Sequence, residues 1–218
     1  MKEMLEQVLR ELGGKRIVFL SEADFQFTLA WKIKEMFGKK FNVILEYPDE
    51  DKEKQRRIYY DIYVCEEGGK AEEGHLIELK YNTKKWKIYR HGNEIPLRNQ
   101  AAHIVGRYQF FADIARLEKQ EIVKGQNYCI MLTNDSLYYA GPKKQDKTAK
   151  LFYIHDGEKI NAGIEPIPDE KRKYLPKDIE IKYSYQCKWQ NYCPLGDGDK
   201  TTEFKYLLLE IPPQKPAE

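Results

Sequence analysis

Two acids and a lysine interrupt the most apolar stretches of this chain of 218 residues. Asp61 lies in the middle of IYYDIYVC (58–65), and Glu78 and Lys80 lie within HLIELKY (75–81). Burying two carboxylates together is costly, because each raises the pKa of the other and desolvation opposes ionisation. A divalent cation removes that cost, and Mg²⁺ prefers one or two carboxylates, several waters and substrate phosphate. A lysine beside such an ion could orient or deprotonate an attacking water.

The two stretches that carry these residues are predicted to be neighbouring strands. Both are rich in β-forming residues, and the segment EEGGKAEEG (66–74) between them is typical of a turn. Side chains alternate between the faces of a strand, so Glu78 and Lys80 share one face of the second strand. If the strands pair, Asp61 can lie beside both of them.

The surrounding elements are predicted from capping residues and hydrophobic pattern. Ser21 is a good N-cap for a helix over Glu22–Phe37, Gly38 ends that helix, and Leu20 and Phe25 are placed for a hydrophobic staple. The other expected elements are a strand at 41–47, a loop at 48–57, a hairpin at 85–96, a helix at 97–118 and a strand at 126–133. This order predicts an α/β core, in which helices cover a mixed central sheet.

Asp61, sixteen further residues and then Glu78-Leu79-Lys80 resemble the D…(D/E)xK signature of the PD-(D/E)XK, restriction-endonuclease-like nuclease superfamily. The element order over roughly residues 17–133 also resembles the αβββαβ core of that superfamily. The resemblance is to bacterial members more than to any named restriction enzyme. Asp61 follows Tyr60, where the superfamily often has proline.

The resemblance implies a role for each matching residue. Asp61 and Glu78 resemble the metal ligands, Lys80 resembles the catalytic lysine, and the Leu79 carbonyl would be a further ligand. Glu22 is the best match to an acid that the superfamily often places on its first core helix. The implied cofactor is Mg²⁺ or Mn²⁺. On the bare pattern, Glu and Lys also occur together on exposed hairpins as cross-strand pairs.

Phosphate contacts are expected downstream of the acidic pair. Residues 80–107 hold seven basic residues and one acid, a net charge of +6, whereas the whole chain carries +2. A local basic zone favours an anionic partner, although a solvated hairpin face explains it equally well. The predicted contacts to phosphate or nucleic acid are Gln100, Arg107, Lys84, Lys85 and Lys87.

The predicted helix carries two groups of polar residues. Gln100, His103 and Arg107 would share one helix face, with a solvated face as the alternative. Asp113, Arg116 and Glu118 are expected to form surface or cross-helix ion pairs.

The chain is expected to form a single domain over residues 1–218. Residues 1–14 form an N-terminal helix that either packs in the core, which is favoured, or makes a homodimer. A β-rich C-terminal extension at about 137–213 follows the core and matches no known pattern. No apolar run reaches membrane-spanning length, so a cytoplasmic protein without a membrane partner is predicted.

The sequence therefore favours a Mg²⁺- or Mn²⁺-dependent nuclease that hydrolyses phosphodiester bonds of DNA, with RNA as the second candidate. The leading alternative is a catalytically inactive nucleic-acid-binding or assembly module on the same fold. A third interpretation is a binder of a small anionic or nucleotide ligand in the same cleft.

Overall fold

The computed structural model describes residues 1–16, 18–51, 55–90, 93–100, 102–141, 152–194 and 203–213. The α-helices are α1 (Lys2–Lys15), α2 (Glu22–Phe37), α3 (His103–Lys119) and α4 (Ser136–Tyr139), and the 3₁₀ turns are η1 (Gly38–Lys40), η2 (Ala71–Glu73) and η4 (Asp169–Lys171). The strands are β1 (Phe41–Asp51), β2 (Arg56–Glu66), β3 (His75–Asn82), β4 (Trp86–Arg90), β5 (Asn93–Leu97), β6 (Asn127–Thr133), β7 (Lys159–Ile160), β8 (Gly163–Glu165), β9 (Ile179–Ile181), β10 (Tyr185–Gln186), β11 (Trp189–Pro194) and β12 (Glu203–Ile211).

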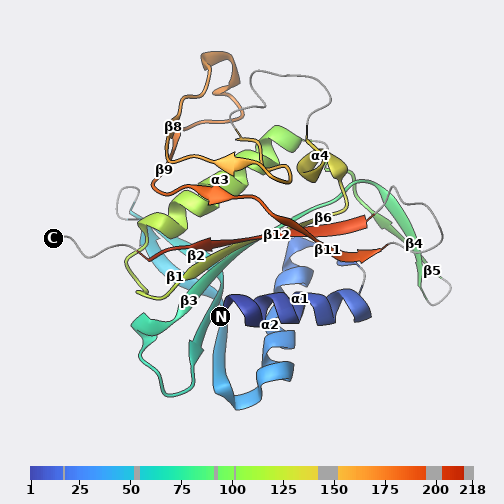
Figure 1. Ribbon diagram of the computed structural model, residues 1–218, viewed down its shortest axis with the longest axis vertical. Helices are drawn as coiled ribbons and strands as arrows, with labels where there is room; N and C mark the ends of the chain where they lie inside the picture. Colours follow the sequence, from blue (N-terminus) through green and yellow to red (C-terminus); the bar gives the residue numbers. More distant parts are fainter. Residues whose placement is uncertain are drawn as a thin grey trace. The chain divides into compact units, whose positions relative to one another are not determined.

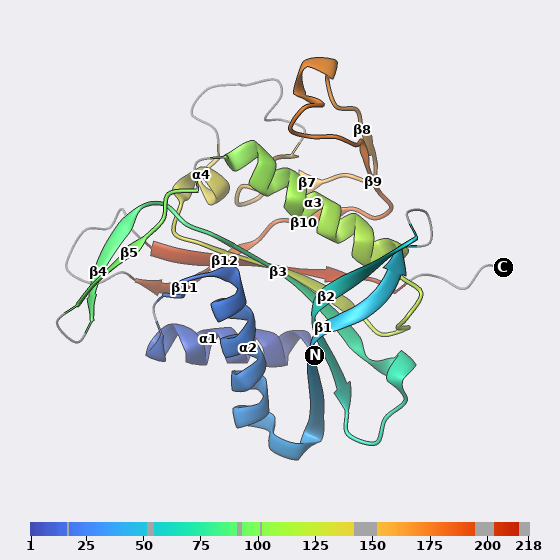
Figure 2. The same cartoon turned by 180° about the vertical axis from the view of Figure 1, so that it is seen from behind.

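The fold is mixed α/β, with a mixed central sheet flanked by helices (Figures 1 and 2). Within the described residues, the sheet has six strands in the order β1-β2-β3-β6-β12-β11, and three two-stranded ribbons are separate from it, β4-β5, β7-β10 and β8-β9. The helix, three strands, helix, strand order predicted from the sequence is present as α2, β1, β2, β3, α3 and β6. Among the described residues, no helix is both long and apolar enough to cross a membrane.

The chain divides into two compact units. Unit 1 comprises Met1–Leu79, Arg116–Ile130 and Glu210–Glu218, and unit 2 comprises Lys80–Ala115 and Met131–Leu209. The prediction of one domain over residues 1–218 stays a prediction.

In unit 1, α1 and α2 pack against each other (Figure 1). Helix α1 buries the apolar side chains of Leu5, Val8, Leu9 and Leu12. Helix α2 has the predicted bounds, because the Ser21 hydroxyl accepts a hydrogen bond from the Asp24 N–H at 3.1 Å and Gly38 ends the helix at φ +57°.

The predicted hydrophobic staple between Leu20 and Phe25 is wrong. Leu20 is 67% exposed, and Phe25 instead contacts Phe19 with ring centroids 4.9 Å apart. The Leu20 N–H donates to the Asp24 carboxylate at 2.9 Å, and Arg16 also binds that carboxylate. These bonds fix the chain before α2 so that the side chain of Phe19, and not that of Leu20, is buried.

The strands of unit 1 form an antiparallel meander. Strand β1 pairs with β2, and β2 pairs with β3 in a register that places Ile62 opposite Ile77. Strand β1 continues to Asp51, so part of the predicted loop at 48–57 is strand. Opposite charges face each other across that added part, where Glu50 and Asp51 pair with Arg57 and Arg56, and such pairs favour strand pairing.

In unit 2, the predicted hairpin is formed by β4 and β5, but the predicted helix is shorter than expected. Helix α3 begins at His103, and Gln100 precedes it. The Gln100 N–H donates to the Thr83 carbonyl at 2.8 Å, and the Thr83 N–H donates to Gln100 Oε1 at 2.7 Å. Gln100 is therefore held by Thr83 before the helix begins, and the expected helical face of Gln100, His103 and Arg107 does not exist.

Candidate active site

Asp61 contacts the strand that carries Glu78. Its Oδ2 accepts a hydrogen bond from the backbone N–H of Leu79 at 2.6 Å. The β2–β3 pairing ends at Ile62 and Ile77, and Asp61 and Glu78 are the next residues of their strands. That the two acids share one face of the sheet stays a prediction.

Glu78 is a buried carboxylate that is neutralised by an arginine. It is 1% exposed, and its Oε1 lies 2.5 Å from Nη2 of Arg116. The guanidinium carbon of Arg116 lies 5.4 Å from the ring centroid of Tyr60. Burial raises the pKa of Tyr60, so its hydroxyl stays neutral. In this arrangement the charge of Glu78 is compensated within unit 1.

Lys80, in unit 2, is also held in an ion pair. Its Nζ lies 2.7 Å from Oδ2 of Asp113, and both side chains are largely buried. Asp113 and Arg116 are three residues apart on α3, and such residues lie on one side of a helix. The prediction that Asp113 and Arg116 form surface or cross-helix pairs is therefore wrong: each pairs with a residue of β3.

The side-chain amide of Gln26 links Glu46 to the main chain of Asp61. The Gln26 side-chain amide donates to Oε1 of Glu46 at 2.6 Å and to the Asp61 carbonyl at 2.7 Å. Glu22, the predicted acid of the first core helix, is half-buried in the first turn of α2, one turn before Gln26.

Glu46 has an unusual backbone. Its φ is +52°, a region that non-glycine residues rarely adopt. The β1–β2 register passes from Leu45–Ile62 to Tyr47–Tyr60 and omits Glu46, whose place in it is opposite Asp61. Backbone strain of this kind is concentrated at functional sites. Glu46 is not among the site residues predicted from the sequence, although an acid inside the apolar strand FNVILEY is the same signal that indicates Asp61.

The acidic residues supply a sparse set of metal ligands. Among the residues that the structure describes, no three His, Cys, Asp or Glu side chains form a group that could hold a metal ion. Mg²⁺ needs only one or two carboxylates, because it keeps several of its waters. Asp61 and Glu78 offer two carboxylates, and Arg116 neutralises that of Glu78.

Some of the predicted phosphate contacts already make other interactions. Lys84 and Lys85 are exposed, and Lys87 is exposed but lies 2.8 Å from Glu94. Gln100 is bonded to Thr83 as described above. Arg107 on α3 donates to the Leu137 carbonyl.

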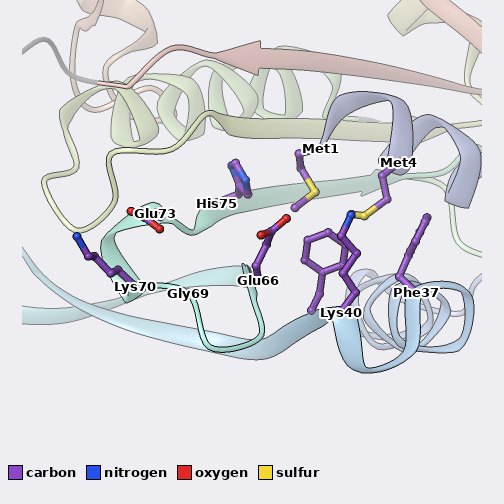
Figure 3. A pocket seen from close by; sticks show the side chains of 10 residues that line it. Met1, Met4, Phe37, Lys40, Glu66, Gly69, Lys70, Glu73 and His75 are labelled. Atoms are coloured by element: carbon purple, nitrogen blue, oxygen red, sulfur yellow. The ribbon is translucent and has the colours of Figure 1, made fainter.

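A pocket of about 280 Å³ lies elsewhere in unit 1 (Figure 3). Its lining does not include Asp61, Glu78 or Glu22, and it combines apolar side chains with charges of both signs: Met1, Met4, Phe37, Phe41, Lys40, Glu66, Lys70, Glu73 and His75, together with Gly69. This combination of apolar, basic and acidic side chains favours no particular class of ligand.

No protein-family model matches the chain, and searches of curated proteins and of solved structures give no significant match. The superfamily relationship therefore stays a prediction from the residues quoted above.

Proposed function

We propose that this protein is a metal-dependent nuclease built on a restriction-endonuclease-like core. The observation that carries the proposal is the contact of Asp61 with the strand of Glu78, through the 2.6 Å hydrogen bond from the Leu79 N–H. Two acids at neighbouring positions of paired strands are a ligand set for Mg²⁺ or Mn²⁺.

Each residue would have a separate task. Asp61 and Glu78 would hold the ion, with the Leu79 carbonyl and Glu22 as further oxygen donors. When bound, the ion supplies Lewis-acid stabilisation of negative charge on the phosphate oxygens. Lys80 would orient the attacking water and compensate the charge that develops in the transition state.

Activity on this account requires an exchange of partners. Glu78 is buried and cannot lose its compensating charge without a large cost in stability. An ion that replaces Arg116 beside Glu78 keeps the carboxylate compensated. Lys80 must likewise leave Asp113 before its ammonium can act on a water.

The proposed substrate is DNA, with RNA as the second candidate. Lys84 and Lys85 lie two and three residues after the end of β3 and are exposed, so they are available for contacts to phosphates of the backbone. Lys87 belongs to the same basic segment, but its pairing with Glu94 competes with phosphate.

The second candidate function is an inactive nucleic-acid-binding or assembly module. The observation that favours it is the pair of internal ion pairs, Glu78 with Arg116 and Lys80 with Asp113. If these pairs never exchange, the two residues stabilise the fold and do no chemistry.

A cleavage assay separates the two candidates. Linear, circular and single-stranded DNA and RNA are incubated with Mg²⁺ or Mn²⁺, and with EDTA as the control. The proposal predicts cleavage that EDTA abolishes. Binding without cleavage of any substrate under these conditions would replace the nuclease with the binding module.

Asp61→Asn is the most informative variant. The amide oxygen of asparagine can still accept from the Leu79 N–H, so the variant should fold, but it loses the charge that holds a metal. Cleavage should fall by about 10²-fold or more. Asp51→Asn is the matched control, because Asp51 pairs with Arg56 on the same sheet and has no proposed role. Equal cleavage by Asp61→Asn and Asp51→Asn would refute the assignment.

A further inference from the structure

Unit 2 contains a second polar cluster, built around a histidine–aspartate pair. Nε2 of His103 lies 2.6 Å from Oδ2 of Asp135. Asp135 is 2% exposed, and its other oxygen caps α4 by accepting from the Leu137 N–H at 3.1 Å. The carboxylate therefore fixes the imidazole at the start of α3.

Arg107 lies one turn further along α3, next to two tyrosines. Its guanidinium carbon is 5.7 Å from the ring centroid of Tyr138 and 5.6 Å from that of Tyr153. Burial lowers the pKa of Arg107, although Tyr138, Tyr153 and Asp135 act in the opposite direction. The surroundings thus compensate this cation incompletely, and an anion placed beside it would be stabilised.

Four polar atoms of this region are buried without a hydrogen-bond partner in the part of the chain that the structure describes. They are Nδ2 of Asn82, Nε of Arg107 and the hydroxyl oxygens of Tyr138 and Tyr153. Tyr138 is only 1% exposed. Folded proteins leave few buried polar groups unpaired, and each calls for an explanation. All four groups can donate a hydrogen bond, so the partner that suits them is an acceptor.

Two of these donors come together at a glycine. A Cβ atom at Gly106 would lie 2.3 Å from the Tyr138 hydroxyl and 3.4 Å from Nδ2 of Asn82. Gly106 therefore permits both groups to approach α3 closely. The ring of His103 lies 5.5 Å from that of Tyr138, centroid to centroid.

We propose that this cluster binds a phosphate group. A phosphate offers several acceptor oxygens in a tetrahedral arrangement, which suits donors that come from β3, α3 and α4, and its charge suits Arg107. The phosphate could belong to inorganic phosphate, a nucleotide or the end of a nucleic-acid strand, since all three present the same chemistry.

The site goes beyond the proposed nuclease activity. It lies wholly in unit 2 and uses none of Asp61, Glu78 and Lys80, and it needs no metal ion. Asn82, His103, Arg107 and Tyr153 are each half-buried, so the cluster reaches the surface, while Tyr138 is its most buried member.

Thermal unfolding and calorimetric titration at constant ionic strength test the proposal, in EDTA so that the metal site plays no part. The probes are inorganic phosphate, a nucleoside with its 5′-monophosphate, and a short single-stranded oligonucleotide with and without a 5′-phosphate. Each phosphate-bearing probe that binds at this cluster should raise the melting temperature, and its phosphate-free counterpart should not. The probe with the largest shift identifies the source. Equal effects of every phosphorylated and unphosphorylated pair, with no effect of inorganic phosphate, would overturn the proposal.

Tyr138→Phe removes one donor and nothing else. Because the hydroxyl has no hydrogen-bond partner among the described residues, the unliganded variant should be at least as stable as the wild type. Its affinity for the phosphate probe should be lower by about tenfold, as expected when a hydrogen bond to a charged group is lost. Tyr174→Phe, at an exposed tyrosine of the same unit, is the matched control and should bind normally.

Arg107→Lys provides a second variant that keeps the charge but loses the planar guanidinium. It too should weaken phosphate binding, whereas binding by both Tyr138→Phe and Arg107→Lys at the wild-type affinity would contradict the assignment.

Discussion

Arg116 lies 2.5 Å from Glu78 and compensates a carboxylate that is 1% exposed. A metal ion bound by Glu78 would have to take over that role, so Arg116 and the ion are competitors. The same contact would stabilise the fold if no metal ever binds. The consequences of removing Arg116 therefore separate a metal site from a purely structural ion pair.

Arg116→Ala should destabilise the metal-free protein by about 3 kcal/mol, because Glu78 is left as a buried charge without its compensating arginine. Mg²⁺ or Mn²⁺ should restore much of that loss and should raise the melting temperature of the variant more than that of the wild type. Chemical denaturation with and without the ion measures both effects.

Lys124→Ala is the control for this experiment. Lys124 pairs with Glu72 at 2.9 Å in the same unit, but both side chains are exposed, so little stability should be lost and no metal-dependent rescue should appear. If Mg²⁺ fails to rescue Arg116→Ala, the Glu78–Arg116 pair is structural.

A double variant separates the structural and catalytic roles of Lys80. Lys80→Met combined with Asp113→Leu replaces a buried ion pair by apolar side chains, and stability should stay within about 1 kcal/mol of the wild type. Cleavage should nevertheless fall by about 10²-fold, since the proposed ammonium is gone. Wild-type cleavage by a stably folded double variant would exclude Lys80 from the chemistry.

Much of the framework around these residues was predictable, because local patterns encode it. Helix α2 has the predicted bounds, since Ser21 and Gly38 are strong local signals. The antiparallel pairing of β2 with β3, which carry Asp61 and Glu78, follows from their β-forming residues and the turn segment between them.

The partners of the predicted residues were not predictable in the same way. Arg116 and Asp113 lie more than thirty residues from Glu78 and Lys80, and no local pattern encodes which face of α3 meets β3. The start of α3 was misjudged because a tertiary contact, Gln100 with Thr83, overrides helix propensity.

The strained backbone of Glu46 can be tested with two substitutions that both remove its side chain. Glu46→Gly and Glu46→Ala each deprive Gln26 of an acceptor, but only glycine relieves the positive φ of +52°. Glu46→Gly should therefore be more stable than Glu46→Ala by about 1 kcal/mol. Equal unfolding free energies would show that this part of β1 is not strained.

His75 should make stability depend on pH. Burial lowers its pKa, and Nδ1 lies 2.6 Å from the Gln126 carbonyl, to which the neutral ring can donate. The unfolded chain then binds a proton more readily than the folded protein. Stability should therefore be highest above the unfolded pKa of about 6.5 and should decline as the pH falls toward the folded pKa.

His75→Gln provides the comparison, because the glutamine amide can still donate to Gln126 but does not titrate. The decline in unfolding free energy on going from neutral to mildly acidic pH should be smaller in His75→Gln than in the wild type. A decline of the same size in both proteins would assign the pH dependence to other groups.

The central claim is that Asp61 and Glu78 hold a divalent cation, and anomalous diffraction from crystals soaked in Mn²⁺ tests it most directly. The account predicts a manganese peak within bonding distance of a carboxylate oxygen of Asp61 and one of Glu78, with the guanidinium of Arg116 moved away from Glu78. No manganese at these carboxylates, with Arg116 still paired to Glu78 at saturating Mn²⁺, would contradict it.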